Sequence, residues 1–314
     1  MAVALTLLIA AMGAAAQEPE PAGSGIRALA VQGNIHVLAG NGGNVAVQAG
    51  GDGLLVVDTQ RESTAQQLLA AVRRLGDGRP IRYIVNSHLH PDHVGGNATF
   101  RPAGETVVAG NVALDIRDAG ATVLAHENVL TRMAAAGSPA AALPTETFFT
   151  PRMSLYFNGE AVELLHQPAA HTDGDVIVFF RRSDVVATGD LFTTTAYPFI
   201  DTAAGGHING IVAGLNRILE ITEPRDKQEG GTMVIPGHGR LSDEADVVEY
   251  RDMVTIIRDR INAMVGQGFT LPQVKAARPT LDYDGRYGAA AGAWTTDMFV
   301  EAVYRGLSGS PQGR

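Results

Sequence analysis

Residues 87–96 read Ser-His-Leu-His-Pro-Asp-His-Val-Gly-Gly, and this stretch decides both the fold and the site of the chain. It places three imidazoles and one carboxylate within six residues: His88, His90, Asp92 and His93. Neutral imidazoles and carboxylates suit zinc, and a loop, unlike a helix, can turn neighbouring side chains toward two different ions. The stretch therefore predicts a metal site built on a loop.

Apolar patterns before this loop place it at the end of a strand. Residues 81–86 (IRYIVN) are typical of a buried strand that runs into the loop, and residues 62–75 (ESTAQQLLAAVRRL) space their apolar side chains as a helix does. Residues 26–58 alternate short apolar runs with Gly and Asn, which predicts a meander of three or four strands. Because α/β folds usually place their ligand-binding and active sites at strand ends, this loop lies where a functional site is expected.

A second series of strands is expected within residues 154–190, after a strand and helix over 121–136. Both series end in an apolar run closed by an acid, Asp58 in VVD and Asp190 in TGD, which suggests two β-rich halves that face each other. The other predicted elements are a short helix at 111–118, a helix at 208–222, a strand and loop at 232–239, a long amphipathic helix at 243–266 and smaller helices beyond 267. No linker divides residues 26–308, which predicts a single domain followed by a tail at 309–314.

A site that holds two metals needs more than four ligands, and three further candidates lie near other strand ends. His171 follows a strand in QPAAHTDGD, Asp190 closes a strand, and His238 lies in the tight turn IPGHG. Small residues flank each of them, so a metal would meet little steric obstruction. The alternatives are that Asp190 bonds only backbone amides at its strand end and that His238 is a turn residue.

These residues carry a resemblance. The H-x-H-x-D-H run followed by His171, Asp190 and His238 resembles the metallo-β-lactamase-fold hydrolase superfamily, over roughly residues 30–260. The resemblance implies an α/β (α+β) fold, a four-layer αββα sandwich of two mixed β-sheets flanked by helices. It also implies the following assignments: His88, His90 and His171 hold one metal, Asp92, His93 and His238 hold the second, Asp190 bridges them, and Asp58 steadies the loop without touching metal.

The resemblance further implies a zinc-dependent hydrolase. Two Zn²⁺ ions, with iron or manganese as alternatives, would share a water and present it as hydroxide, while Asp92 orients it and carries its proton to the leaving group. The expected substrate is small and anionic, and the expected bond is of carbonyl type: a lactone, a thioester or a β-lactam. The alternatives are a β-lactamase proper, a mono-iron persulfide dioxygenase-like oxidoreductase, and a binding protein without catalysis.

The composition of the chain bears on which binding partners and which cell compartment are expected. The formal charge of −9 and the pI near 5.4 leave no basic surface for nucleic acid. Residues 1–16 (MAVALTLLIAAMGAAA) have the shape of a signal peptide, and residues 17–25 that of a flexible linker. These features predict export to the periplasm and no membrane contact after cleavage, whereas a membrane anchor would need about 20 residues. Without cysteine, the chain has no disulfide and no thiolate ligand.

The remaining histidines receive different predictions. His36 and His166 lie in strand-like runs and are expected to form ordinary hydrogen bonds, and His126 is expected to cap or pack at the start of a helix. His207 lies in a Gly-rich stretch downstream of Asp190 that could overhang the site. Three residues are therefore predicted to contact substrate: Tyr197, His207 and Asn209.

Overall fold

The computed structural model describes residues 25–40, 42–106 and 120–309. The predicted signal peptide, the linker up to residue 24, the predicted helix at 111–118 and the tail from residue 310 lie outside the described residues. In the described part, none of the helices combines the length and the apolar character that crossing a bilayer requires.

The first half of the chain builds a sheet of seven strands. Its strands, in sheet order, are β1 (Arg27–Ala30), β2 (Ile35–Ala39), β3 (Val45–Gly50), β4 (Gly53–Val57), β5 (Ile81–Val85), β6 (Thr122–His126) and β7 (Glu146–Phe148). The first four form the predicted antiparallel meander, and β4 to β7 run parallel, so this sheet is mixed. The carboxyl ends of β4, β5 and β6 consequently meet at one edge.

The second half builds a mixed sheet of six strands. In sheet order these are β13 (Ser242–Asp243), β12 (Met233–Ile235), β11 (Val185–Ala187), β10 (Asp175–Phe180), β9 (Glu160–Gln167) and β8 (Arg152–Phe157). Strands β11 and β12 are parallel, and their neighbours are antiparallel. This sheet contains all the strands that were expected within residues 154–190.

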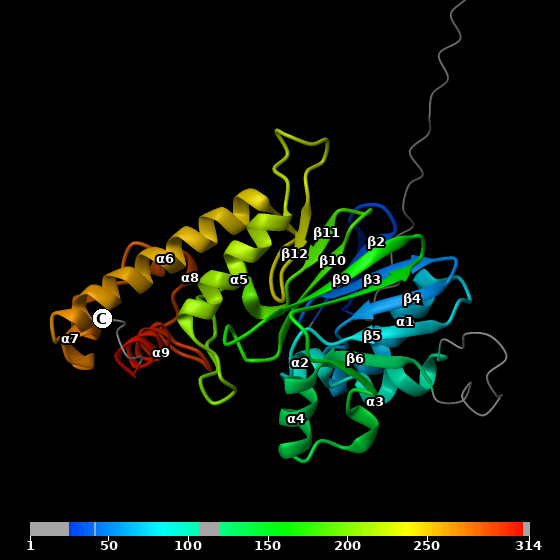
Figure 1. The fold of residues 1–314 in the computed structure, drawn as a ribbon, viewed down its shortest axis with the longest axis horizontal. Helices are drawn as coiled ribbons and strands as arrows, with labels where there is room; N and C mark the ends of the chain where they lie inside the picture. The colour runs from blue at the N-terminus through cyan, green and yellow to red at the C-terminus, as the bar shows by residue number, and fades with distance from the viewer. Residues whose placement is uncertain (1–24, 41, 107–119, 310–314) are drawn as a thin grey trace, which may run out of the picture.

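The two sheets pack face to face, and helices cover their outer faces (Figure 1). Apolar side chains such as Leu55 and Val57 of β4 meet Leu164 of β9 and Val178 of β10 in the middle layer. The outer face of the first sheet is covered by α1 (Ala65–Gly76) and α3 (Asn97–Phe100). The outer face of the second sheet is covered by α5 (Ile208–Ile221), α6 (Glu244–Gly266) and α9 (Thr296–Gly309). The predicted four-layer αββα sandwich is therefore confirmed.

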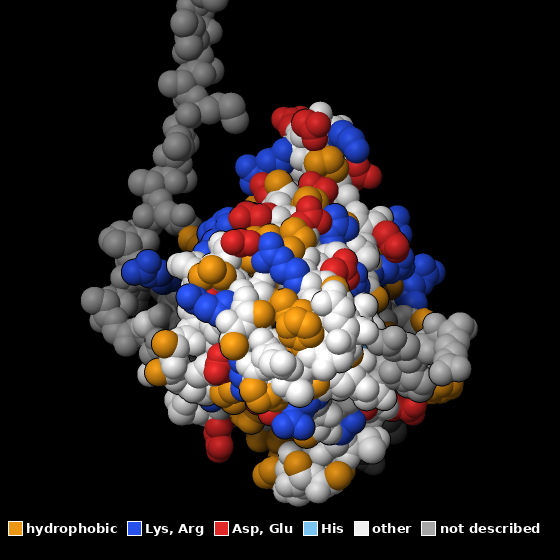
Figure 2. All heavy atoms as spheres, turned by 90° about the vertical axis from the view of Figure 1, so that its left-hand side faces the viewer, with side chains coloured by type: hydrophobic (Ala, Val, Ile, Leu, Met, Phe, Trp, Pro, Cys, Tyr) orange, Lys and Arg blue, Asp and Glu red, His pale blue; other side chains and the backbone are white. Residues whose placement is uncertain are grey.

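Shorter elements complete the described chain. They are η1 (Glu62–Thr64), α2 (Pro91–Val94), η2 (Arg101–Ala103), α4 (Glu127–Ala135), η4 (Ala140–Ala142), η5 (Gly189–Leu191), α7 (Leu271–Ala277) and α8 (Asp284–Tyr287). Figure 2 shows the face formed by the C-terminal helices, where basic and acidic side chains lie interspersed.

The stretch 87–96 differs from a simple loop. The chain leaves β5, turns through His88, and begins the single-turn helix α2 at Pro91. Proline is favoured at this first position because its fixed φ suits a helix and its missing N–H would have no helical partner there. His88 lies in the bend after β5, whereas Asp92 and His93 lie in the helix, so these neighbouring side chains leave the backbone from different local structures.

Candidate metal centre

Seven side chains from both halves of the chain converge at one edge of the sandwich. The first ligand group consists of His88, His90, His171 and Asp190, and the second of Asp92, His93 and His238. Within each group the donor atoms lie within 4.8 Å of one another. The structure thus brings together every residue that the sequence predicts as a metal ligand, in the two groups that the resemblance implies.

Asp190 connects the two groups. Its Oδ2 atom lies 3.9 Å from Nε2 of His88 and 3.8 Å from Nε2 of His171. Its Oδ1 atom lies 3.2 Å from Nε2 of His93 and 3.6 Å from Nε2 of His238. One carboxylate oxygen therefore faces each group, which is the placement expected of a bridging ligand.

The donor set fits divalent metal ions. Nε2 of the fully buried His88 has no hydrogen-bond partner in the described part of the chain. A buried polar atom without a partner costs about 1–3 kcal/mol, which a coordinated cation would offset. Imidazole nitrogens and carboxylate oxygens without thiolates match the ligands of zinc, and they also accept iron or manganese.

Asp58 holds the second ligand group in place from behind. Its Oδ2 lies 2.7 Å from Nδ1 of His93, and its carboxylate accepts hydrogen bonds from the backbone N–H and the hydroxyl of Ser87 at 2.8 and 2.6 Å. Ser87 Oγ in turn lies 3.0 Å from Nδ1 of His88. Asp58 is thus placed as the resemblance implies, since it fixes ring orientations and leaves each Nε2 facing the centre.

His90 and His171 are oriented by two groups that the sequence analysis missed. Nε2 of His90 lies 2.9 Å from Oδ2 of Asp201, and Nδ1 of His171 lies 2.7 Å from the backbone oxygen of Phe199. If each ring donates its N–H there, the free nitrogens are Nδ1 of His90 and Nε2 of His171, which lie 2.9 Å apart and face the centre. Asp201 lies 111 residues along the chain from His90 and so gives no spacing signal, and a backbone oxygen gives none at all.

The turn that carries His238 is held by the first sheet. The side-chain amide of Asn44 donates to the backbone oxygens of Pro236 and Gly239 at 2.9 and 3.0 Å, and its backbone N–H donates to Gly237 at 2.7 Å. Gly237 has to be glycine, because a Cβ atom there would lie 2.0 Å from Oδ1 of Asp190. The absence of a side chain at Gly237 thus lets the backbone of this turn lie directly against the carboxylate of Asp190.

Arg61 was also missed and borders the second group. Its Nη2 atom lies 3.0 Å from Oδ2 of Asp92, and the same oxygen lies 3.6 Å from Nε2 of His238. The Arg61 side chain is about half exposed, so it contacts solvent as well as the site. It restrains the Asp92 side chain and adds positive charge at the rim.

Burial and charge set the ionisation of the ligands. Burial, reinforced by His93 and His171, holds the pKa of His88 well below its usual value, and burial lowers the pKa of His171 to about 4. Both rings are therefore neutral at pH 7, the form that binds metal. Burial alone would lower the pKa of His93, but the carboxylates of Asp190 and Asp58 raise it well above the usual value. A cation bound there would displace that proton.

The predicted substrate contacts are not brought to the cluster. Tyr197 is buried, and its hydroxyl lies 2.9 Å from Oδ1 of Asp284 and 3.1 Å from the backbone oxygen of Thr280. His207 caps α5 by accepting from the N–H of Asn209, whose side chain is exposed. Contact of these three residues with substrate stays a prediction, while the geometry gives Tyr197 and His207 structural roles.

The other histidines lie apart from the ligand groups. His126 caps α4, as predicted, by accepting from Asn128 N–H, and its ring stacks on His166 at 3.5 Å between centroids. His166 bonds the backbone oxygen of Asp173 at 2.8 Å. His36 lies in β2, and its Nδ1 has no hydrogen-bond partner in the described part.

The relatives of this chain include two kinds of enzyme, an alkylsulfatase and metallo-beta-lactamases. A linear primary-alkylsulfatase of Pseudomonas sp. (strain ATCC 19151) is 24% identical over 83% of this chain and 55% of its own length. A type 2 metallo-beta-lactamase of Bacillus sp. (strain 170) is 21% identical over 64% of this chain and 68% of its own length. This chain is thus similar to both, and it spans about half the length of the alkylsulfatase.

Solved structures share the fold. The stereoselective inverting sec-alkylsulfatase of Pseudomonas sp. superposes with a TM-score of 0.67 at 16% identity, over 89% of this chain and 50% of that one. The metallo-beta-lactamase from Pontibacter korlensis superposes with a TM-score of 0.56 at 16% identity, over 73% of this chain and 99% of that one. The family model described as "Metallo-beta-lactamase superfamily" matches residues 38–238, which include Asp58 and all seven candidate ligands. The chain belongs to the metallo-beta-lactamase superfamily.

Proposed function

We propose that this chain is a hydrolase that uses two divalent ions, zinc in the first instance, to cleave an ester-type bond in a small anionic substrate. The observation that carries the proposal is the position of Asp190, which directs one carboxylate oxygen toward each ligand group. A shared carboxylate favours a dinuclear centre over the mono-iron dioxygenase alternative, in which fewer ligands hold one metal.

Each ligand group would hold one ion, and the charges of the ions and their ligands set the net charge of the site. His88, His90 and His171 would hold one ion, Asp92, His93 and His238 the other, and Asp190 would join them. When bound, two such ions lower the pKa of a water that they share toward about 7 and polarise the bond to be cleaved. Two carboxylates against two divalent cations leave a positive surplus, to which Arg61 adds, and this favours an anionic substrate.

Asp92 would carry the proton in the proposed reaction. Arg61 and His238 approach its Oδ2 from two different loops, at 3.0 and 3.6 Å, so the carboxylate is held at the edge of the cluster. In the proposed reaction the water oxygen bonds to the substrate's electrophilic atom, and Asp92 accepts the water proton. The bond to the leaving group then breaks, and Asp92 returns the proton to that group.

The bond type has two candidates. Carbonyl-type bonds, in a lactone, a thioester or a β-lactam, suit attack by an activated water, and similarity to metallo-beta-lactamases supports the lactam. A sulfate ester is the second candidate, because the similarity to the alkylsulfatase covers 83% of the chain and so extends past the segment that the family model matches.

One experiment separates these possibilities. The purified chain would be analysed for bound metal and assayed against 4-nitrophenyl esters, γ-lactones, thioesters, a chromogenic cephalosporin and alkyl sulfates. We expect about two zinc ions per chain and turnover of at least one class. We also expect Asp190→Asn to lose metal and activity, whereas the exposed control Asp259→Asn on α6 keeps both. A single iron per chain would support the dioxygenase, and two metals without any turnover would support a binding protein.

We also propose export to the periplasm, on the pattern of residues 1–16. Expression of the full chain in a Gram-negative host tests this. A periplasmic product that begins at Gln17 is expected, and an uncleaved cytoplasmic product would contradict it.

A further inference from the structure

One aromatic side chain borders the first ligand group, and a second packs against it. The ring centroid of Phe199 lies 5.5 Å from those of His90 and His171, and 39% of the Phe199 surface is exposed. The ring of Trp294 packs edge-on against Phe199, with centroids 4.7 Å apart and planes at 74°. We call these two residues the aromatic wall. A large apolar side chain exposed beside a polar ligand cluster marks a surface on which a ligand can bury apolar area.

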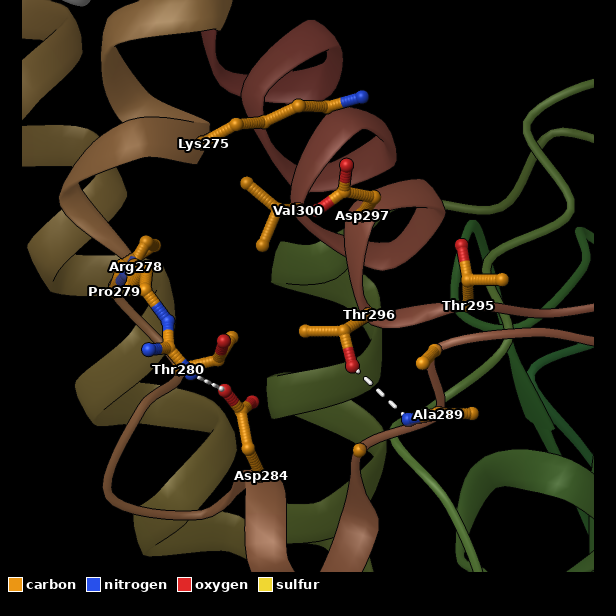
Figure 3. A pocket seen from close by; sticks show the side chains of 12 residues that line it. Lys275, Arg278, Pro279, Thr280, Asp284, Ala289, Thr295, Thr296, Asp297 and Val300 are labelled. Atoms are coloured by element: carbon orange, nitrogen blue, oxygen red, sulfur yellow. Dashed lines mark hydrogen bonds and ion pairs between the residues drawn. The ribbon is translucent and has the colours of Figure 1, made fainter.

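A closed loop carries Trp294 to this position. The N–H of Thr296 donates to the backbone oxygen of Ala289 at 2.9 Å, and the N–H of Ala289 donates to the Thr296 hydroxyl at 3.0 Å. Figure 3 shows the second of these bonds, and residues 288–293, just before Trp294, are all Gly or Ala. The indole N–H of Trp294 has no hydrogen-bond partner in the described part of the chain. Packing against Phe199 and the neighbouring core therefore holds the ring.

The same loop also lines a cavity, which is less suited to binding a charged ligand. This cavity of about 680 Å³ is seen in Figure 3, and Lys275 and Arg278 also contribute to it. Lys275 pairs with Glu301 at 2.9 Å and Arg278 with Asp284 at 3.5 Å. The basic groups of the cavity are thus already neutralised, whereas Phe199 of the aromatic wall lies beside two candidate metal ligands, His90 and His171.

We infer that the aromatic wall is an apolar subsite, which receives an alkyl or aryl group next to the bond that is cleaved. The inference rests on the proposed function and names the substrate class: an amphiphile whose polar, scissile group lies at the metal ligands and whose apolar group lies on Phe199 and Trp294. Trp294 lies beyond residues 38–238, so the C-terminal part of the chain supplies half of the subsite. Burial of each added methylene group should strengthen binding about fourfold.

Binding can be measured without turnover, because Trp294 is the one tryptophan of the chain. The metal-loaded full chain would be titrated with acetate, butanoate, hexanoate and octanoate while tryptophan emission is recorded. We expect saturable changes whose affinity rises about fourfold per methylene up to the length of the subsite. In Phe199→Ala the gain per methylene should fall below about twofold, while Tyr156→Ala, an exposed aromatic on β8, should keep the wild-type gain. Equal gains in Phe199→Ala and the wild type would overturn the subsite.

Turnover supplies a second test. For 4-nitrophenyl esters from acetate to octanoate, kcat/KM should rise with chain length in the wild type and in Tyr156→Ala. The slope should be reduced in Trp294→Phe and lost in Trp294→Ala. Hydrolysis of all chain lengths at equal kcat/KM would refute the subsite and leave the proposed function intact. If no ester or other substrate class is hydrolysed while the emission titration still shows chain-length dependence, the proposed function fails and the subsite stands.

Discussion

Nδ1 of His90 lies 2.9 Å from Nε2 of His171, while the opposite nitrogen of His90 contacts Asp201 at 2.9 Å. The second contact fixes which nitrogen faces the centre. A histidine that hydrogen-bonds a carboxylate is oriented and made a better donor, and loss of such a partner typically costs 10–100-fold in metal affinity.

Asp201→Ala should therefore lower the affinity of the first ligand group for zinc by about 10–100-fold. Asp201→Asn should lower it less, because the amide oxygen still accepts from His90. Chelator competition measures both, with Asp259→Asn as the control. Unchanged affinity in Asp201→Ala would show that His90 is oriented by other contacts.

Asp92→Asn should reduce kcat by at least about 100-fold, because an amide cannot accept the proton of the attacking water. The fold should be retained, since Asp92 is partly exposed and its substitution leaves the buried core untouched. Steady-state kinetics and thermal unfolding measure the two effects. Full activity in this variant would remove Asp92 from proton transfer.

Gly237→Ala should disrupt the bridging ligand, because the added Cβ would lie 2.0 Å from Oδ1 of Asp190. Bound metal should fall below two ions per chain, and activity should fall with it. Gly266→Ala is the matched control, since open space surrounds that position near the end of α6. Normal metal content in Gly237→Ala would contradict the close approach of turn and carboxylate.

His126 should make stability depend on pH. Burial, together with His166, lowers its pKa to about 4 from an ordinary value of 6.5. Below pH 6.5 the unfolded chain therefore binds a proton at His126 that the folded chain does not bind. The contribution of neutral His126 to the free energy of unfolding is consequently lost as pH falls from 6.5 toward 4.

Allowing for solvent screening, the loss between pH 7 and pH 5 is about 1 kcal/mol. His126→Asn keeps a helix-capping side chain and removes the titration. Urea unfolding at both pH values, on metal-loaded protein, should show a smaller loss of stability in the variant than in the wild type. An identical loss in both proteins would exclude His126 as the source.

The family resemblance predicted the sandwich, whereas local signals in the sequence pointed to the strands, the helices and the seven candidate ligands near strand ends. The helical spacing of 62–75 appears as η1 and α1, and the strand ends after Val57, Val85 and Ala187 carry Asp58, His88 and Asp190. Two mixed sheets must bury both inner faces, so the ligands that follow their strands meet at a common edge.

The supporting residues could not be predicted in the same way. Arg61, Asn44 and Asp201 reach the site through tertiary contacts that have no fixed spacing from the ligands they hold. Trp294 reaches Phe199, beside the site, on a loop of Gly and Ala that carries no pattern. Conversely, Tyr197 was placed near the site only because it follows Asp190, whereas its side chain turns toward Thr280 and Asp284.

Anomalous X-ray scattering at the zinc absorption edge, measured on crystals of the metal-loaded protein, tests the dinuclear centre most directly. Two peaks are predicted about 3.5–4 Å apart, one beside each ligand group with Asp190 between them. A single peak at either group, or peaks away from the carboxylate of Asp190, would contradict the account.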